Sequence, residues 1–354
     1  MKIKKMEKGS AYNGKLSLGC QHCWNGSKMV LLVTGKCKGV CWYCPLSKKK
    51  KGKSVVYSSE KFIDSKEEIL EEAELINATG TGITGGDPLF CNETYDYIEM
   101  LKAYFGPGHH IHLYTQITNM DKIRRAIEAG LDEIRFHPPV DLWETIEDTE
   151  YPIVIEELQK LQVDVGVEVP SIPEEKHGTY HLLRRLGPIV DFVNLNELEF
   201  SSTNWKELVQ RGYKKKSDIS DAVEESQEFA MKHLKEDFDT SVHYCSSSFK
   251  DGVQMRKRIQ RRAKNVAKPG EIISEDGLVI KGIILADHPR VYISELKYKF
   301  GIPDEMIWYD VEKERIEMAL DILDEISDEI EYECYGVEEY PTADRLEVER
   351  WPLK

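Results

Sequence analysis

The sequence contains no long apolar run, and no stretch approaches the roughly 18 apolar residues of a membrane-spanning helix. Its basic start, Met1–Met6, is not followed by the apolar region of a secretory signal. The sequence therefore predicts a cytoplasmic protein without a membrane partner. An excess of positive charge is lacking too, since the net charge of −15 argues against a protein that generally coats nucleic acid.

Cysteine is used unevenly, and five of the eight thiols lie before residue 45, as expected for metal binding in a reducing compartment. Cys37, Cys41 and Cys44 are spaced C-x3-C-x2-C, directly after the apolar run Met29–Val33. A fourth cysteine is missing from this loop. Closed iron–sulfur and structural zinc sites have four ligands, and a disulfide with a spare thiol suits a small secreted protein. Three thiols favour a [4Fe–4S] cluster with one open iron.

This loop resembles the cysteine motif of the radical SAM superfamily, which favours an aromatic residue before the third cysteine, where Tyr43 stands. The resemblance implies that the open iron chelates the amino and carboxylate groups of S-adenosylmethionine. It also implies an external electron donor, such as a flavodoxin or ferredoxin. Reductive cleavage would give methionine and a 5′-deoxyadenosyl radical that abstracts hydrogen from a substrate. The sequence identifies neither the substrate nor a catalytic side chain.

A second motif lies one strand and one helix downstream, at Gly85, Gly86 and Asp87. Without Cβ atoms, paired glycines let backbone groups approach a ligand closely, although alone they indicate only a turn that ends a strand. The motif resembles the superfamily's Gly-Gly-Glu sequence, which binds the amino group of S-adenosylmethionine. Asp87 replaces the glutamate, a variant found in parts of the family.

Strands alternate with helices at intervals of roughly 25–30 residues, which indicates repeated βα units on a parallel sheet. Strands are predicted over 29–33, 110–115, 133–136, 163–170, 192–197 and 241–245. With the resemblance, this predicts an α/β fold: a partial (β/α)6-type radical SAM barrel with a small C-terminal α+β appendage. The expected divisions are an N-terminal extension (1–27), the barrel (28–264) and the appendage (271–354). Helices are also predicted over 221–234, 250–264 and 311–326.

Polar residues follow several predicted strands, where an α/β barrel keeps its active site. In the resembled family, residues at the ends of the middle strands hold the ribose and carboxylate of the cofactor. Six residues occupy comparable places: Thr115, Gln116, Asn119, Arg135, His137 and Glu168. Arg135 could pair with a carboxylate through its forked donors or form an ordinary salt bridge. The run 167–173 resembles a Pro-x-Ile-Pro turn of glycyl-radical-activating enzymes, the branch typified by the pyruvate formate-lyase activator.

A second metal site is a further hypothesis. Cys20 and Cys23 form a C-x2-C pair, which is half of a metal-site signature, and Cys245 ends a late strand beside His243. Together they could bind a second iron–sulfur cluster or zinc. The alternatives are that the pair only flanks the cluster loop and that Cys245 is an ordinary buried residue.

The leading interpretation is a radical SAM enzyme whose substrate is unknown; the sequence is compatible with a protein or a tRNA as that substrate. A tRNA-modifying enzyme is the alternative suggested by two basic segments, 48–53 and 256–264, in an otherwise acidic chain. A non-catalytic iron–sulfur protein that carries electrons or stabilises structure is the alternative from another class. The open iron and the glycine pair favour the enzyme.

Overall fold

The computed structural model describes residues 2–354 and divides into two compact units. The first comprises the described residues up to Glu74 together with Ala78–Met255. The second comprises Leu75–Asn77 and Arg256–Lys354. Within the described part of the chain, no helix combines the length and apolar character needed to cross a membrane.

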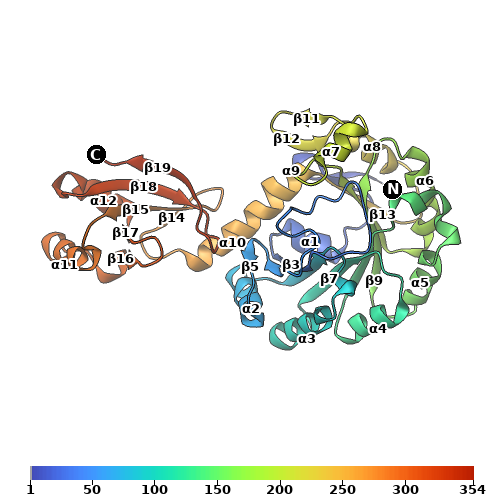
Figure 1. Ribbon diagram of the computed structural model, residues 1–354, viewed down its shortest axis with the longest axis horizontal. Coiled ribbons are helices and arrows are strands. Elements are labelled where there is room, and N and C mark those ends of the chain that lie inside the picture. Colours follow the sequence, from blue (N-terminus) through green and yellow to red (C-terminus); the bar gives the residue numbers. More distant parts are fainter. Residues whose placement is uncertain (1) are drawn as a thin grey trace. The chain divides into compact units, whose positions relative to one another are not determined.

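The first unit is built on a sheet whose seven central strands run parallel, in the order β13-β10-β9-β8-β7-β6-β3. Antiparallel β2 pairs with β13 at one edge and β4 with β3 at the other, so the barrel is open. Figure 1 shows the strands curving into a ring with helices outside it. The parallel strands are β3 (Lys28–Thr34), β6 (Gly80–Gly85), β7 (His110–Thr115), β8 (Glu133–Phe136), β9 (Asp164–Ser171), β10 (Phe192–Glu197) and β13 (Ser241–Cys245).

The α/β fold with a partial barrel is confirmed, and the predicted strands lie within a residue or two of the observed ones. The main helices of this unit are α1 (Leu18–Trp24), α2 (Lys66–Leu75), α3 (Glu93–Phe105), α4 (Met120–Glu128), α5 (Tyr151–Leu158), α6 (Lys176–Leu186), α7 (Trp205–Gln210) and α8 (Ser226–His233). The short strands at its edges are β1 (Lys4–Lys5), β2 (Ala11–Tyr12), β4 (Tyr57–Ser58) and β5 (Lys61–Phe62).

Side-chain alternation explains how one strand serves both the core and the barrel interior. In β8, Ile134 and Phe136 are fully buried apolar residues, whereas Arg135 between them bonds to polar groups of neighbouring strands. In β10, Asn194 and Asn196 bond to Glu168 of β9. Because successive side chains of a strand point to opposite faces, the apolar set packs on one face and the polar set meets on the other.

Local signals set the ends of two helices. Ser65 and Glu68 form a capping box at α2, in which Glu68 accepts from the Ser65 N–H at 3.2 Å and the Ser65 hydroxyl accepts from the Glu68 N–H at 3.4 Å. Beyond α4, Gly130 adopts φ +113°, a left-handed conformation that glycine takes without a Cβ penalty.

One predicted helix needs correction, and another is confirmed with a different start. Residues 221–223 do not begin a helix but lie in strand β12 (Ser220–Val223), which pairs with β11 (Lys215–Ser217) in a hairpin. Glu225 then takes a left-handed φ of +66°, which separates this strand from α8. The predicted basic helix over 250–264 is helical but begins with a π-helical segment, Lys250–Met255, before α10 (Arg256–Val266).

The second unit is an antiparallel sheet with strand order β16-β17-β15-β18-β19, to which β14 adds by pairing with β15. Its elements are α10, β14 (Ile272–Ile273), β15 (Val279–Leu285), α11 (Pro289–Phe300), β16 (Ile307–Asp310), β17 (Arg315–Met318), α12 (Leu320–Ile326), β18 (Glu333–Glu339) and β19 (Glu347–Pro352). The predicted helix over 311–326 is correct only from Leu320 onward, because Arg315–Met318 pair with both β15 and β16.

Candidate active site

The three cysteines lie on a loop that begins at the end of β3 and folds back, so that its last residues bond to its first. The Gly35 N–H donates to the Lys53 carbonyl, and the Gly52 N–H donates to the Gly35 carbonyl, each at 2.8 Å. All three thiols are free, and Cys37 is exposed. The Gln116 amide, just beyond β7, donates to the Cys41 sulfur at 3.2 Å. The loop therefore presents its thiols at the end of the barrel where the parallel strands terminate.

Tyr43 anchors this loop to the barrel interior. Its side chain is buried, and its hydroxyl lies 3.1 Å from Nε2 of His137. The His137 Nδ1 is 2.7 Å from the Glu168 carbonyl, so we assign the Nδ1 proton to that bond. The Nε2 lone pair is then left to accept from Tyr43. Burial raises the pKa of the Tyr43 phenol, which keeps this donor protonated.

The glycine turn is attached directly to the root of the cysteine loop. The Gly86 N–H donates to the Thr34 carbonyl at 2.7 Å, and the Asp87 N–H donates to the Lys36 carbonyl at 2.9 Å. A Cβ on Gly85 would lie 2.3 Å from the Thr34 oxygen, and one on Gly86 2.2 Å from the Lys36 oxygen. Only glycine fits such close approaches, so the pair fixes the turn against the cysteine loop.

Asp87 binds the next strand rather than projecting into solvent. Its carboxylate accepts from the Thr115 hydroxyl at 2.8 Å, the Gln116 N–H at 2.8 Å and the Leu89 N–H at 3.1 Å. Burial raises the pKa of this carboxyl, while the three donors oppose that shift. Thr115 is itself buried. Asp87 therefore fixes the end of β7 and, with it, the Gln116 side chain that contacts Cys41.

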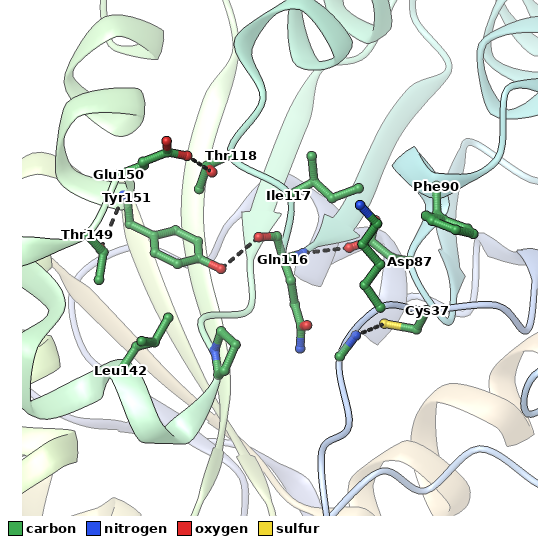
Figure 2. Close-up of a pocket in the computed structure, with 13 residues that line it drawn as sticks. Cys37, Asp87, Phe90, Gln116, Ile117, Thr118, Leu142, Thr149, Glu150 and Tyr151 are labelled. Carbon is green, nitrogen blue, oxygen red and sulfur yellow. Dashed lines mark hydrogen bonds between the residues drawn. The ribbon is translucent and has the colours of Figure 1, made fainter.

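A cavity of about 410 Å³ opens beside the cysteine loop, within the roughly 300–1,000 Å³ typical of small-molecule sites. Figure 2 shows Asp87, Gln116 and Tyr151 around it, with Cys37 at one side. The Tyr151 hydroxyl donates to the Gln116 carbonyl at 2.8 Å and the Thr118 hydroxyl to the Glu150 carboxylate at 2.5 Å. The lining residues are Cys37, Lys38, Gly39, Asp87, Phe90, Gln116, Ile117, Thr118, Pro139, Leu142, Thr149, Glu150 and Tyr151.

A charged network fills the barrel interior. The Arg135 guanidinium donates to Glu168 at 2.6 Å and also pairs with Glu133, while Asn194 and Asn196 donate to Glu168 at 2.8 and 2.7 Å. Burial alone would raise the pKa of Glu168, but Arg135 and the two amides lower it to about 2. Arg135 and Glu168 thus bind each other, and their predicted contact with the cofactor stays a prediction.

Cys20 joins this network from α1, which lies inside the strand ring in Figure 1. Arg135 and Asn194 donate to its sulfur at 3.5 and 3.2 Å. Burial opposes ionisation, but Arg135 and then His243 lower the pKa of the Cys20 thiol to about 6. The donors around its sulfur favour the thiolate form of Cys20.

The other members of the predicted second metal site lie nearby. Cys23 donates to the Gln254 side-chain oxygen at 2.7 Å, and the amide of the same side chain donates to Cys245 at 3.6 Å. The Nδ1 of His243 is 3.2 Å from the Asn194 oxygen, and its Nε2 is buried with no hydrogen-bond partner. Across residues 2–354, no three His, Cys, Asp or Glu side chains converge as the ligands of one metal ion would.

The absence of a single-ion site from the described residues does not argue against a polynuclear cluster, because each cysteine of such a cluster binds a different iron. Cluster ligands therefore lie farther apart than the ligands of one ion. Three free thiols on one loop, fixed beside a cavity, fit a cluster with one open iron. We take the thiolate donor set of Cys37, Cys41 and Cys44 as suited to iron.

Sequence patterns did not identify several residues that shape the site. Tyr151 lies at the start of α5 and reaches the cavity only through the barrel's curvature, so no local pattern marks it. Gln116, in contrast, directly follows a predicted strand end and was among the residues predicted to hold the cofactor. The contact between Cys20 and Arg135 joins residues 115 positions apart, which spacing alone cannot reveal.

These features define an α/β-barrel enzyme whose active site lies at the rim formed by the ends of its parallel strands. Residues 31–140, which include the cysteine loop and the glycine turn, match the radical SAM superfamily. Residues 277–353 match a domain of unknown function, DUF8061.

A full-length relative extends the match. A Methanocaldococcus jannaschii protein named "Putative glycyl-radical enzyme activating enzyme MJ0021" is 41% identical over 369 aligned positions, which cover 100% of this chain and 97% of that protein. The chain therefore belongs to the radical SAM superfamily and is an enzyme. This membership implies a [4Fe–4S] cluster and S-adenosylmethionine as its cofactors.

Proposed function

We propose that Cys37, Cys41 and Cys44 hold a [4Fe–4S] cluster whose open iron binds S-adenosylmethionine. The bound cofactors would supply a 5′-deoxyadenosyl radical by reductive cleavage of the sulfonium. The observation that carries this proposal is the junction of three elements: the thiol loop, the glycine turn bonded to its root, and the cavity beside Cys37. A four-cysteine electron carrier would need neither the turn nor the cavity.

The protein's own residues would position the cofactors and exclude water. Asp87 holds Gln116, whose amide reaches the Cys41 sulfur. The hydrogen bond between Tyr43 and His137 holds the loop against the barrel. A hydrogen bond to a cluster sulfur is one of the ways a protein tunes the reduction potential of the cluster. The Gln116 amide, which donates to the Cys41 sulfur, is positioned to make such a bond.

The substrate we propose is a protein. The relative's name describes an enzyme that activates a glycyl-radical enzyme, and its similarity covers the whole of this chain. In that role the radical would abstract hydrogen from a backbone glycine of a partner enzyme. Val40 of the cysteine loop is 98% exposed, so this loop is accessible to a macromolecular substrate.

The proposal is tested with anaerobically reconstituted full-length protein and dithionite as reductant. We expect formation of 5′-deoxyadenosine and methionine from S-adenosylmethionine, together with at least about four irons per chain, the content of the cluster on the cysteine loop. A fully loaded and reduced protein that leaves S-adenosylmethionine intact would favour a non-catalytic iron–sulfur protein instead.

We also propose that Cys20, Cys23, His243 and Cys245 form a second metal site. The buried Nε2 of His243 supports it, because no hydrogen-bond partner is found for this atom in the part of the chain that the structure describes and a His whose Nδ1 is bonded elsewhere is oriented to ligate through Nε2. Metal analysis of the same preparation decides the matter. About eight irons are expected per chain, because the absence of a convergent single-ion site among residues 2–354 favours a second cluster over zinc. Iron for a single cluster and no zinc would end the hypothesis.

A further inference from the structure

The charge around the cysteine loop is opposite to that of the chain. Residues 35–53 contain seven lysines and no acidic residue, and residues 205–217 contain four lysines, one arginine and one glutamate. The protein as a whole has a net charge of −15. We call these two segments the basic collar. Most of its side chains are exposed, including Lys36, Lys38, Lys48, Lys49, Lys51, Lys53 and Lys214.

The two segments of the collar are joined to each other at the cysteine loop. The Thr203 hydroxyl donates to the Leu46 carbonyl at 2.8 Å, and the Asn204 amide donates to the Tyr43 carbonyl at 3.0 Å. Trp42 stacks on Tyr213 with ring centroids 5.8 Å apart. The Arg211 guanidinium lies 4.3 Å above the same indole. The two basic segments therefore lie side by side at the loop that holds Cys37, Cys41 and Cys44.

Part of the collar is paired within the protein. Lys215 bridges Asp221 at 2.5 Å, and Lys216 lies 3.8 Å from Glu197. In the cysteine-loop segment, Lys36 lies near Glu93 and Lys50 lies near Glu60, whereas the other five lysines are exposed. Surface charge of one sign around a site steers oppositely charged molecules to it and raises their association rate.

We infer that the basic collar is the docking surface for a small acidic one-electron carrier protein. This inference rests on the proposed function, because the cluster must receive one electron for each cleavage. The carrier loses one electron and the cluster gains it, and no bond is made or broken in the transfer. Because Cys37 is exposed within the collar, a partner docked there would lie close to the cluster.

The chemistry of the collar favours a protein over a nucleic acid. Eleven of its twelve cations are lysines, whereas Arg supplies the forked donors that suit phosphate and base recognition. Val40, 98% exposed in the cysteine loop, and Ile219, 99% exposed at the tip of the β11–β12 hairpin, add apolar contacts. Lysines around apolar side chains suit the small, transient interfaces of electron-transfer partners.

The test uses full-length, cluster-loaded protein and an acidic flavodoxin as the probe. The triple variant Lys48→Glu, Lys49→Glu, Lys51→Glu reverses charge on the collar. The matched control Lys160→Glu, Lys232→Glu, Lys235→Glu makes the same charge change at the helix ends opposite the rim. At low ionic strength we expect the collar variant to bind oxidised flavodoxin at least about tenfold more weakly, and the control to stay within about twofold of the unmodified protein.

Dithionite-driven cleavage of S-adenosylmethionine separates this inference from the proposed function. The collar variant should retain that activity while losing reduction by flavodoxin. Unchanged flavodoxin binding in the collar variant would overturn the inference. Loss of tRNA binding by that variant with flavodoxin binding intact would overturn it as well, and would assign the surface to nucleic acid. If dithionite gives no cleavage in any form, the proposed function fails, whereas the binding measurement still reports on the collar.

Discussion

Replacing Cys41 with alanine is expected to abolish cleavage of S-adenosylmethionine. Two remaining thiolates cannot hold a cubane whose fourth iron is already without a protein ligand. Formation of 5′-deoxyadenosine should fall by about a thousandfold or more, to the level of protein without a cluster. The measurement is product formation under dithionite, normalised to protein, with iron content determined on the same sample.

The matched control is Cys91→Ala. Cys91 is a half-buried thiol just after the glycine turn, and its sulfur donates to the Glu93 carboxylate at 3.0 Å rather than joining the cysteine loop. Burial and that carboxylate raise the pKa of Cys91 to about 11, so it is a poor ligand. This variant should keep its iron and most of its activity. Substantial cleavage by Cys41→Ala would show that the cluster is held elsewhere.

The second large effect concerns stability. Arg135→Met should destabilise the first unit by roughly 3–5 kcal/mol, because Glu133 and Glu168 are left buried without their cation. Arg135 is only 2% exposed, and methionine retains much of its volume but none of its donors. Thermal unfolding of the metal-free protein, followed by calorimetry, measures the change. The control Arg124→Met breaks an exposed 3.4 Å pair with Glu157 and should cost less than about 1 kcal/mol.

The pH dependence of this variant distinguishes a lost ion pair from lost packing. The pKa of Glu168 is lowered to about 2 in the folded protein, against an ordinary value of 4.5. The stabilisation from its pairing is therefore complete above pH 4.5 and disappears as pH falls toward 2. The difference between Arg135→Met and the unmodified protein should shrink over this range. A difference that is independent of pH would mean that packing, not charge, is lost.

The parallel strands were predictable because their signals are local. Each is a short apolar or alternating run bounded by glycine, proline or a cap, and β7, β8, β10 and β13 match their predicted bounds. The hairpin of β12 was mistaken for a helix because its pairing with β11 is set by backbone hydrogen bonds, not by composition. The same reason applies to β17, which is central to the antiparallel sheet of the second unit.

The cysteine loop and the glycine turn could be predicted because each is a short local motif. Cys37, Cys41 and Cys44 are close in sequence, and the glycine pair follows one βα unit later. What sequence could not supply are the contacts between strands. Thr115 and Gln116 meet Asp87 only because β6 and β7 are neighbours, and Arg135 meets Glu168 only because β8 and β9 are. Register in a parallel sheet brings such residues together, and no spacing rule shows it.

The central claim is that the cluster on Cys37, Cys41 and Cys44 has an open iron that binds S-adenosylmethionine. Electron paramagnetic resonance of the dithionite-reduced protein, recorded with and without S-adenosylmethionine, tests it most directly. Binding of the amino and carboxylate groups to one iron changes the ligand field of the cluster, so we expect the spectrum to shift on addition of the cofactor. Identical spectra at saturating S-adenosylmethionine would contradict an open iron and, with it, the proposed function.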